Sequence, residues 1–393
     1  MRRSTRAVEI AINLAALQHN LHIVRRCAPH SRVFAVVKSD AYGHGAVPVA
    51  HALTGIADAF AVVAVDEALI LREAGVTAPI LVLQGARTAG EMRAVAAHDL
   101  WPVVHTDSQL AWLDQLTTAV DEPHQVWLKL DSGMGRLGFT ASELQQHWQA
   151  LHAHPQIRCA GVLSHFASAD TPSDPFNAVQ LETFRTALAA LGTDAPLPFQ
   201  SLANSAAVLA LPASHLDWVR PGIMLYGPNP VTASQGVVSQ LDTPLRPVMQ
   251  VTAPIISIKQ RRRGDSIGYA QTWSCPEDMP IALVACGYGD GLPRVLENAS
   301  VLWVGDGAGT GSGTKVLPVI GRVSMDSIAV DLRPARTPNA QAGTDPVSVQ
   351  VGDRVELWGD NHSIEKMAAA AGTIPYELLC GIRGERRYLE GGA

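Results

Sequence analysis

The sequence predicts an α/β fold: an N-terminal (β/α)8 barrel of the TIM type over residues 1–243, followed by a C-terminal, mainly β-strand domain over residues 244–393. Short β-branched runs alternate with helical stretches through the first part of the chain, which is typical of a parallel sheet. About eight such units in roughly 230 residues suit a closed barrel, whose usual length is about 250 residues. After Pro244 the helical periodicity fades, and turn residues separate short strand-like runs.

The predicted barrel strands are short apolar or β-branched runs. In chain order they cover residues 33–38, 60–65, 80–83, 101–104, 125–130, 157–163, 199–202 and 218–219. The helices predicted between them include residues 47–54, 66–74, 88–98, 177–191 and 205–209. In the second domain, strands are predicted at residues 248–259, 281–286, 315–320, 328–332 and 353–357.

Composition and charge exclude several classes of protein. Of the 393 residues, 47% are hydrophobic and 17% are charged, which is the opposite of a disordered chain. The formal net charge of −6 argues against a nucleic-acid partner. Apolar runs fall far short of the ~20 residues that span a bilayer, so we expect no membrane association.

The termini and the cysteines indicate a cytoplasmic protein. Glu9 and Asn13 interrupt the stretch that follows Met1, so we expect no signal peptide. The five cysteines are odd in number and form no CxxC pair, which predicts reduced thiols and no structural metal site.

Glycine occupies every second position from Gly305 to Gly313. A phosphate-binding loop leads into the N-terminus of a helix, whereas a predicted strand follows here. We interpret this run as a surface loop.

Lys38 ends the first predicted barrel strand and is followed by a glycine-containing turn. Active sites of such barrels lie at the C-terminal ends of the strands. Burial there lowers the pKa of a lysine, and such a lysine forms Schiff bases with carbonyl compounds such as pyridoxal 5′-phosphate. The pattern alone leaves open an ordinary lysine that reaches solvent from a strand end.

The segment 35–45 around Lys38 resembles the cofactor-lysine motif of the alanine racemases, a family of fold-type III enzymes that use pyridoxal 5′-phosphate. Further motifs of that family follow in the same order along almost the whole chain. They lie at residues 129–139, 164–167, 204–207, 219–227, 267–269, 287–291, 321–326 and 374–377. The resemblance implies interconversion of L-alanine and D-alanine, which supplies D-alanine for peptidoglycan.

The resemblance implies two acid/base residues, Lys38, which also holds the cofactor, and Tyr269. Racemisation removes a proton from one face of the substrate Cα and returns one to the opposite face. Two groups on opposite faces meet that need. Apart from the family, Tyr269 could be an ordinary strand aromatic.

The phosphate of the cofactor is expected near the ends of the last two barrel strands, as is usual in barrels. Ser205 opens a predicted helix, and Gly222 lets the backbone approach an anion closely. The resemblance implies phosphate contacts from Tyr42, Asn204, Ser205, Gly222, Ile223 and Tyr376. From the residues alone, the Asn204–Ser205 pair could equally be a helix cap.

The resemblance places Arg220 beside the pyridine nitrogen, with His165 positioning it. Because an arginine is always a donor, it leaves that nitrogen unprotonated, which favours a short-lived carbanion and limits side reactions. As an alternative, His165 could be a satisfied core histidine.

Arg136 is implied near the substrate carboxylate and the cofactor phenolic oxygen. The resemblance also implies substrate contacts from Met325, through its backbone amide, and from Tyr288 and Asp326. Tyr269 and Met325 come from the partner's second domain in this family, which implies a head-to-tail homodimer with shared active sites.

Alternation in residues 126–131 puts Lys129 on the face opposite Val126 and Leu128, so we expect it to point into the barrel. The equivalent lysine of many relatives is carbamylated, and we expect the same anion here to orient Arg136. The alternative is an unmodified lysine paired with Asp131.

Three other functions stay open at this point. They are a racemase of another or broader amino-acid range, a fold-type III amino-acid decarboxylase, and a non-catalytic protein of pyridoxal-phosphate homeostasis. The motifs around Tyr269 and Met325 argue against the decarboxylase, and the second domain argues against the homeostasis protein.

Overall fold

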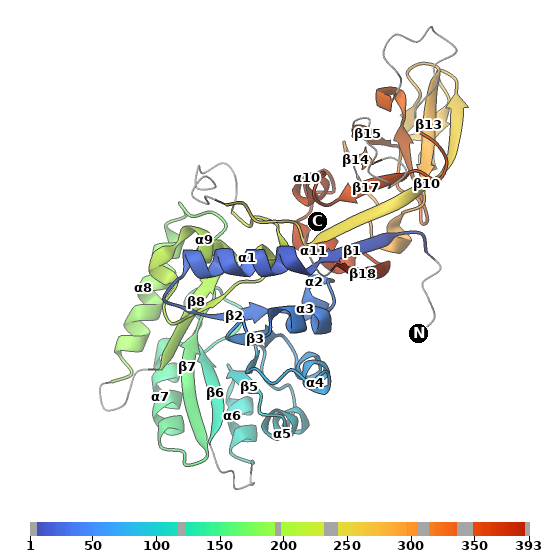
Figure 1. The fold of residues 1–393 in the computed structure, drawn as a ribbon. Helices are drawn as coiled ribbons and strands as arrows, with labels where there is room; N and C mark the ends of the chain where they lie inside the picture. Colours follow the sequence, from blue (N-terminus) through green and yellow to red (C-terminus); the bar gives the residue numbers. More distant parts are fainter. Residues whose placement is uncertain are drawn as a thin grey trace. The chain divides into compact units, whose positions relative to one another are not determined.

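The structure is a computed structural model that describes residues 6–116, 123–192, 198–231, 243–296, 298–304, 314–335 and 349–389 (Figure 1). The chain forms two compact units. The barrel unit comprises Ala16–Arg246, and the β unit joins Met1–Ala15 to Pro247–Ala393. The glycine-rich run 305–313 lies outside the described residues.

The barrel unit contains a closed barrel of parallel strands in the order β2 to β9, which confirms the predicted fold class. Pairing of β2 with β9 closes it. The strands are β2 (Arg32–Val36), β3 (Ala59–Val62), β4 (Ile80–Val82), β5 (Trp101–Val104), β6 (His124–Lys129), β7 (Ile157–Leu163), β8 (Phe199–Asn204) and β9 (Trp218–Arg220).

Helices follow the barrel strands β2 to β8, as the alternating pattern predicts, whereas α1 precedes β2. They are α1 (Leu14–Cys27), α2 (Lys38–Tyr42), α3 (Ala46–Leu53), α4 (Val65–Glu73), α5 (Ala89–Ala97), α6 (Asp107–Leu113), α7 (Ala141–His152), α8 (Phe176–Ala189) and α9 (Ser205–Ala210). Local sequence sets several of their starts. Thr140 and Glu143 form a capping box at α7, and the Thr88 hydroxyl accepts a hydrogen bond from the Glu91 amide at α5.

Aromatic side chains fill the interior of the barrel. Phe34 of β2 stacks on Trp218 of β9 at 4.0 Å and meets Trp127 of β6 edge-on at 5.3 Å. Because β2 and β6 lie on opposite sides of the closed barrel, this contact crosses its interior. Gly161 leaves room for the Trp127 ring, since a Cβ there would lie 2.4 Å from that ring.

The β unit is built on one large sheet with the strand order β13-β16-β15-β14-β17-β10-β1-β18, and β13 also pairs with β10. Its strands are β1 (Glu9–Asn13), β10 (Met249–Arg261), β13 (Met279–Val284), β14 (Ser300–Trp303), β15 (Lys315–Ile320), β16 (Ile328–Asp331), β17 (Arg354–Trp358) and β18 (Glu385–Leu389). A short hairpin, β11 (Ser266–Ile267) with β12 (Trp273–Ser274), and two helices, α10 (Ile364–Ala370) and α11 (Pro375–Gly381), complete it. The prediction lacks the strands β1, β14 and β18, the hairpin, and the helices α10 and α11.

The first residues of the chain differ from the predicted domain division. Strand β1 pairs antiparallel with β10 and parallel with β18, so it belongs to the β unit and not to the barrel. Ile10 and Ile12 alternate with more exposed residues and are buried in this sheet. The boundary expected after residue 243 falls after Arg246.

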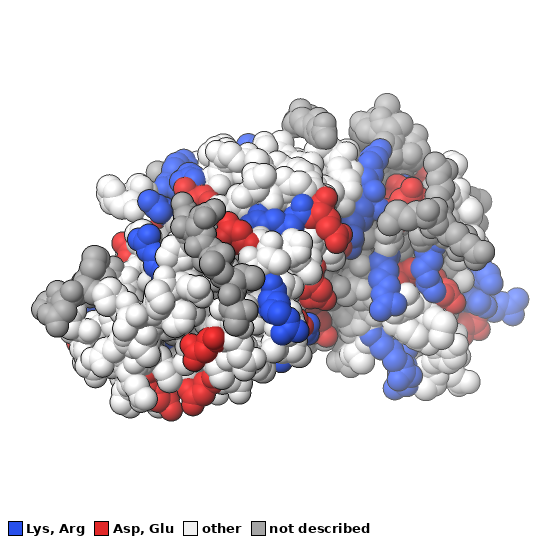
Figure 2. Space-filling view, turned by 90° about the horizontal axis from the view of Figure 1, so that it is seen from below, with Lys and Arg blue, Asp and Glu red and all other residues white. Residues whose placement is uncertain are grey.

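Two further observations concern membrane association and surface charge. Among the helices that the structure describes, none has the length and apolar character that crossing a membrane requires. On the face seen in Figure 2, basic and acidic side chains are both scattered among uncharged ones.

Candidate active site

Lys38 lies at the C-terminal end of the barrel strands, but not inside a strand as predicted. Strand β2 ends at Val36, and Lys38 opens the short turn α2. The four residues that follow, Ser39 to Tyr42, all have φ between +52° and +54°, so this turn is left-handed. Such a backbone costs L-residues about 1–2 kcal/mol each, and surrounding contacts must hold it in place.

Tyr42, the last residue of this turn, lies close to Ser205 and Gly222, which follow two other barrel strands. The hydroxyl of Ser205, at the start of α9, accepts hydrogen bonds from the amides of Gly222 at 2.8 Å and Met224 at 3.4 Å. A Cβ on Gly222 would lie 2.5 Å from the hydroxyl oxygen of Tyr42. Ile223, between the two amides, is buried. We call Tyr42, Ser205 and Gly222 the hydroxyl–amide cradle.

Asn204 caps the helix that carries Ser205. Its side-chain oxygen accepts a hydrogen bond of 3.1 Å from the amide of Ala207. In this structure Asn204 therefore plays the helix-cap role that the sequence left open, and it fixes the position of Ser205.

Arg220 ends β9 and is buried, and burial lowers the pKa of its guanidinium to about 10. Its terminal nitrogens donate to the Ser201 hydroxyl at 2.6 Å, to the Leu202 carbonyl at 3.3 Å and to the Ser164 carbonyl. Among the described residues, the Nε of Arg220 has no hydrogen-bond partner. One donor of a buried arginine is thus left for a group outside the chain.

His165 lies beside Arg220, with its Nδ1 3.5 Å from a guanidinium nitrogen. Burial, and then the charge of Arg220, hold the pKa of His165 well below its usual range. The imidazole is therefore neutral, and its Nδ1 acts as the acceptor toward Arg220. Ser201, which also touches Arg220, had no recognisable signal in the sequence beyond being a polar residue inside a strand.

Lys129 ends β6 and is 9% exposed. Burial, followed by the charges of Arg220, Arg136 and Lys38, lowers the pKa of Lys129 to about 8, against an opposing effect of Asp131. The same set of charges acts on His165, so the four cationic side chains share one region at the mouth of the barrel.

Asp131 does not form an ion pair with Lys129. Its carboxylate accepts hydrogen bonds from the amides of Gly133 at 2.9 Å and Gly135 at 3.1 Å, which shapes the loop that carries Arg136. Within the described part of the chain, Lys129 has no acidic partner within 4.0 Å.

The other expected site residues belong to the β unit, where three segments lie side by side. The amide of Tyr288 donates to the Ser324 carbonyl at 3.1 Å, and the amide of Gly289 donates to the Met325 carbonyl at 2.8 Å. A Cβ on Gly268, next to Tyr269, would lie 3.3 Å from the Arg322 amide nitrogen. The structure thus brings Tyr269, Tyr288, Met325 and Asp326 into one region.

Several large side chains of this region are exposed to solvent. Tyr269 is 63% exposed, Met325 51% and Tyr288 39%. Tyr376, near the start of α11, belongs to the β unit as well and is half-buried.

Arg6 is a residue of this region that the sequence did not reveal. It forms ion pairs with Asp290 at 2.9 Å and with Asp326 at 3.2 Å. The buried Asp290 also accepts a hydrogen bond of 2.9 Å from the Gly287 amide. Arg6 therefore joins the turn of Tyr288 to the segment of Met325.

Comparison with known proteins identifies the family. The family model "Alanine racemase, N-terminal domain" matches residues 12–230, and "Alanine racemase, C-terminal domain" matches residues 248–388. The chain belongs to the alanine racemase family. This confirms the resemblance drawn from the motifs.

Relatives of known name cover nearly the whole chain. The alanine racemase of Coxiella burnetii (strain RSA 493 / Nine Mile phase I) is 41% identical over 381 residues, which is 96% of this chain and 97% of the relative. That of Halorhodospira halophila is 44% identical over 377 residues, or 96% and 95%. The match includes both units, so the whole architecture is shared.

Solved structures have the same fold. The biosynthetic alanine racemase from Pseudomonas aeruginosa superposes with a TM-score of 0.84 at 39% identity, covering 98% of this chain and 100% of that one. Alanine racemase from Bartonella henselae with covalently bound pyridoxal phosphate gives a TM-score of 0.81 at 29% identity, covering 98% and 99%.

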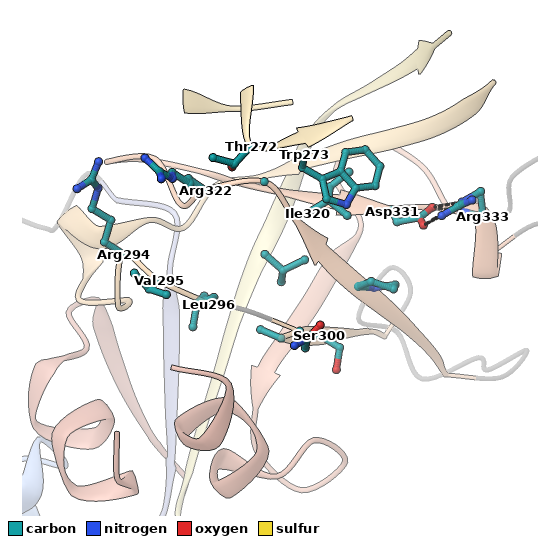
Figure 3. A pocket seen from close by; sticks show the side chains of 15 residues that line it. Thr272, Trp273, Arg294, Val295, Leu296, Ser300, Ile320, Arg322, Asp331 and Arg333 are labelled. Carbon is teal, nitrogen blue, oxygen red and sulfur yellow. Dashed lines mark hydrogen bonds and ion pairs between the residues drawn. The ribbon is translucent and has the colours of Figure 1, made fainter. Parts of the chain in front are cut away.

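A separate cavity of about 850 Å³ lies in the β unit (Figure 3). Trp273, Ile320 and Arg322 line it, together with Arg333, which pairs with Asp331 at 2.7 Å. None of the site residues expected from the sequence lines this cavity.

In the residues that the structure describes, no group of His, Cys, Asp and Glu is placed to hold a metal ion.

Proposed function

We propose that this protein is a pyridoxal-phosphate-dependent racemase that interconverts L-alanine and D-alanine. The observation that carries the proposal is the hydroxyl–amide cradle of Tyr42, Ser205 and Gly222 beside the turn of Lys38. The hydroxyls of Tyr42 and Ser205 are donors that suit a phosphate group, and Ser205 and Gly222 follow the last two barrel strands, where barrels commonly bind phosphate. When bound, the cofactor withdraws electrons from the substrate Cα and so makes its proton removable.

The residues present fit this cofactor at three points. The cradle fits the phosphate, and it needs Gly222 because any Cβ there would strike Tyr42. The partnerless Nε of the buried Arg220 fits a hydrogen-bond acceptor, such as the ring nitrogen. Lys38 fits the carbonyl carbon, since it lies at the ends of the barrel strands in the same region as Lys129, Arg136 and Arg220.

Arg220 and His165 together control that ring nitrogen. The guanidinium can only donate, so it keeps a facing nitrogen unprotonated. His165 stays neutral and accepts from Arg220, which holds the guanidinium plane without competing as a donor. Stabilisation of negative charge on the substrate is therefore limited, which favours rapid return of a proton to Cα.

Two side chains carry out the proton transfers. In one direction of the reaction, one of them removes the Cα proton from its face while the other donates a proton to the opposite face, and in the reverse direction the roles are exchanged. The groups are the Nζ of Lys38 on one face and the hydroxyl of Tyr269 on the other. Arg136 and the Met325 amide bind the substrate carboxylate, with Tyr288 and Asp326 completing the region around Met325. Tyr376 contributes a further hydroxyl to the phosphate.

We assign Tyr269 and Met325 to the active site of a partner subunit in a head-to-tail homodimer. The exposure of Tyr269, Tyr288 and Met325 supports this assignment, because a monomer would leave three catalytic-region side chains in water. Closed pairing of identical chains is also the commonest form of oligomer.

We further propose that Lys129 is carbamylated. Its lowered pKa supports this, because only a neutral amine attacks carbon dioxide, and three neighbouring cations favour the anion that forms. The carbamate would then orient Arg136. We place the protein in the cytoplasm, supported by five free cysteines, with D-alanine for peptidoglycan as its physiological product.

The function is tested by giving the purified holoenzyme L-alanine and measuring D-alanine by chiral chromatography. Wild type is expected to approach equal amounts of the two enantiomers, and Lys38→Ala is expected to make none. Formation of carbon dioxide and an amine instead would identify a decarboxylase. A wild-type protein that binds the cofactor and leaves alanine unchanged would contradict the proposal.

A further inference from the structure

Glu67 contacts the strained turn directly next to Lys38. Its Oε1 accepts a hydrogen bond of 2.6 Å from the amide of Ser39, the residue that follows Lys38. Its Oε2 accepts from the amides of Val63 at 2.8 Å and Ala64 at 3.3 Å. One carboxylate therefore joins the β2–α2 connection to the β3–α4 connection.

The bonds of Glu67 to its own helix start are common in proteins, whereas its bond to Ser39 comes from a different strand–helix connection. Glu67 occupies the third position of α4, and its bonds to Val63 and Ala64 are those of a helix cap. Glu91 occupies the same position of α5, where it bonds to the Arg87 amide at 2.7 Å and pairs with the Arg87 guanidinium at 2.7 Å. Among the described residues, it has no bond to the connection after another strand. Glu67 therefore has two structural roles, because it caps α4 and also holds the Ser39 amide.

The left-handed turn is tied at both of its ends. At the far end, Asp40 accepts a hydrogen bond of 2.8 Å from the Ala46 amide, and the Tyr42 ring packs on Tyr226 at 4.9 Å. At the Lys38 end, the Glu67 carboxylate holds the Ser39 amide. Since strained backbone relaxes when its ties are removed, this bond sets where the turn begins.

We propose that Glu67 is a positioning residue for Lys38: its carboxylate holds the Ser39 amide and thereby fixes the direction in which Lys38 leaves the β2–α2 turn. This inference rests on the proposed function, in which Lys38 carries the cofactor. Both carboxylate oxygens are needed, because one binds Ser39 while the other caps α4.

The substitution Glu67→Gln tests the inference sharply. Glutamine has the same shape but one acceptor oxygen, and its NH2 group would face an amide N–H. It can keep the cap or the Ser39 bond, and not both. Glu67→Asp retains the charge but is one methylene shorter, so it cannot span the two connections either. Glu91→Gln is the matched control for a lost helix cap.

The holoenzymes of wild type and the three variants are compared by cofactor absorbance across pH, by the rate of cofactor release on dilution, and by kcat and KM for alanine. We expect both Glu67 variants to shift the pH at which the cofactor band changes and to release cofactor faster. We expect their kcat to fall about tenfold or more, with KM for alanine changed less than threefold, because small misplacements of reacting groups are costly. Glu91→Gln is expected to match wild type in all of these while unfolding at a lower temperature.

Wild-type absorbance and release in Glu67→Gln, or an equal loss in Glu91→Gln, would overturn the inference. Recovery of wild-type behaviour by Glu67→Asp would assign the effect to charge and would also overturn it. If wild type itself neither binds the cofactor nor converts alanine, the proposed function fails instead. The absorbance and release measurements keep the two failures apart.

Discussion

The hydroxyl oxygen of Ser201 accepts a hydrogen bond of 2.6 Å from the buried guanidinium of Arg220, while its own hydrogen is donated to the Trp218 carbonyl at 2.7 Å. One small side chain on β8 therefore fixes a cation on β9. Because Ser201 is fully buried, no water replaces it when it is removed.

Ser201→Ala is expected to lower the free energy of unfolding by about 1.5–3 kcal/mol, since the lost hydrogen bond is to a charged group. It should also weaken cofactor binding, because Arg220 loses its orientation. The matched control is Ser214→Ala, which removes a neutral bond of 2.7 Å to the Leu211 carbonyl and should cost about 1 kcal/mol. Urea unfolding measures both, and equal losses would contradict the special role of Ser201.

Gly222→Ala should weaken cofactor binding at least tenfold, because the new Cβ would lie 2.5 Å from the Tyr42 hydroxyl and close the cradle. Titration of the apoenzyme with pyridoxal phosphate, followed by absorbance, gives the dissociation constant. Gly90→Ala is the control, since its nearest neighbour is 3.6 Å away. A wild-type dissociation constant in Gly222→Ala would exclude the cradle as the phosphate site.

The lowered pKa of His165 predicts how stability depends on pH. The folded state keeps this histidine neutral, whereas the unfolded state protonates it below about pH 6.5. The unfolded chain then binds more protons, so stability falls as pH decreases, by about 1.4 kcal/mol per pH unit for this residue. In His165→Gln the slope below pH 6 should be smaller by that amount. An unchanged slope would show that His165 takes up a proton in the folded state.

The lowered pKa of Lys129 predicts the pH dependence of its carbamylation. Above its pKa of about 8 the amine is neutral and reacts with carbon dioxide, while below it the ammonium does not. Enzyme stripped of carbon dioxide should therefore regain activity when carbon dioxide is restored with bicarbonate. At a fixed concentration of dissolved carbon dioxide, the recovery should become faster as pH rises towards about 8 and should level off above it. Lys129→Met should show no dependence on bicarbonate, and a wild type that shows none either would argue against the modification.

A shared active site predicts complementation between two inactive chains. Mixed dimers of Lys38→Ala and Tyr269→Ala contain one site with both residues intact, provided that Tyr269 acts in the partner's barrel. Purified heterodimers should show about half of the wild-type activity per dimer, since one of two sites works. If each chain used its own Tyr269, every site would carry one substitution and the mixture would stay inactive.

The sequence predicted the fold class because the features that decide it are periodic. Strand and helix periods alternate through the barrel, and their loss marks the second domain. The predicted division places residues 9–13 in the barrel domain and predicts no strand there, because five alternating residues do not reveal their partner strands, which lie more than 230 residues away.

The motifs identify single residues of the candidate site, but they do not reveal which distant residues contact them. The sequence does not predict the left-handed turn after Lys38, because Ser39 to Tyr42 include no glycine, the residue that usually indicates a positive φ. Glu67 and Ser201 were missed because their partners are 28 and 19 residues away and are set by the closed barrel. Arg6 reaches a partner 284 residues away, a distance that only the folded β unit reveals.

We propose that Lys38 and Tyr269 transfer protons on opposite faces of the alanine Cα. The most direct test incubates the wild-type holoenzyme with L-alanine in deuterium oxide and follows D-alanine and Cα deuterium together by NMR. We expect D-alanine that carries deuterium at Cα in wild type, and no D-alanine from Lys38→Ala. In Tyr269→Phe we expect loss of inversion, with Cα exchange retained for the one enantiomer whose Cα proton faces Lys38 when each enantiomer is given in turn. Bound cofactor with neither exchange nor inversion in wild type would contradict the proposed pair.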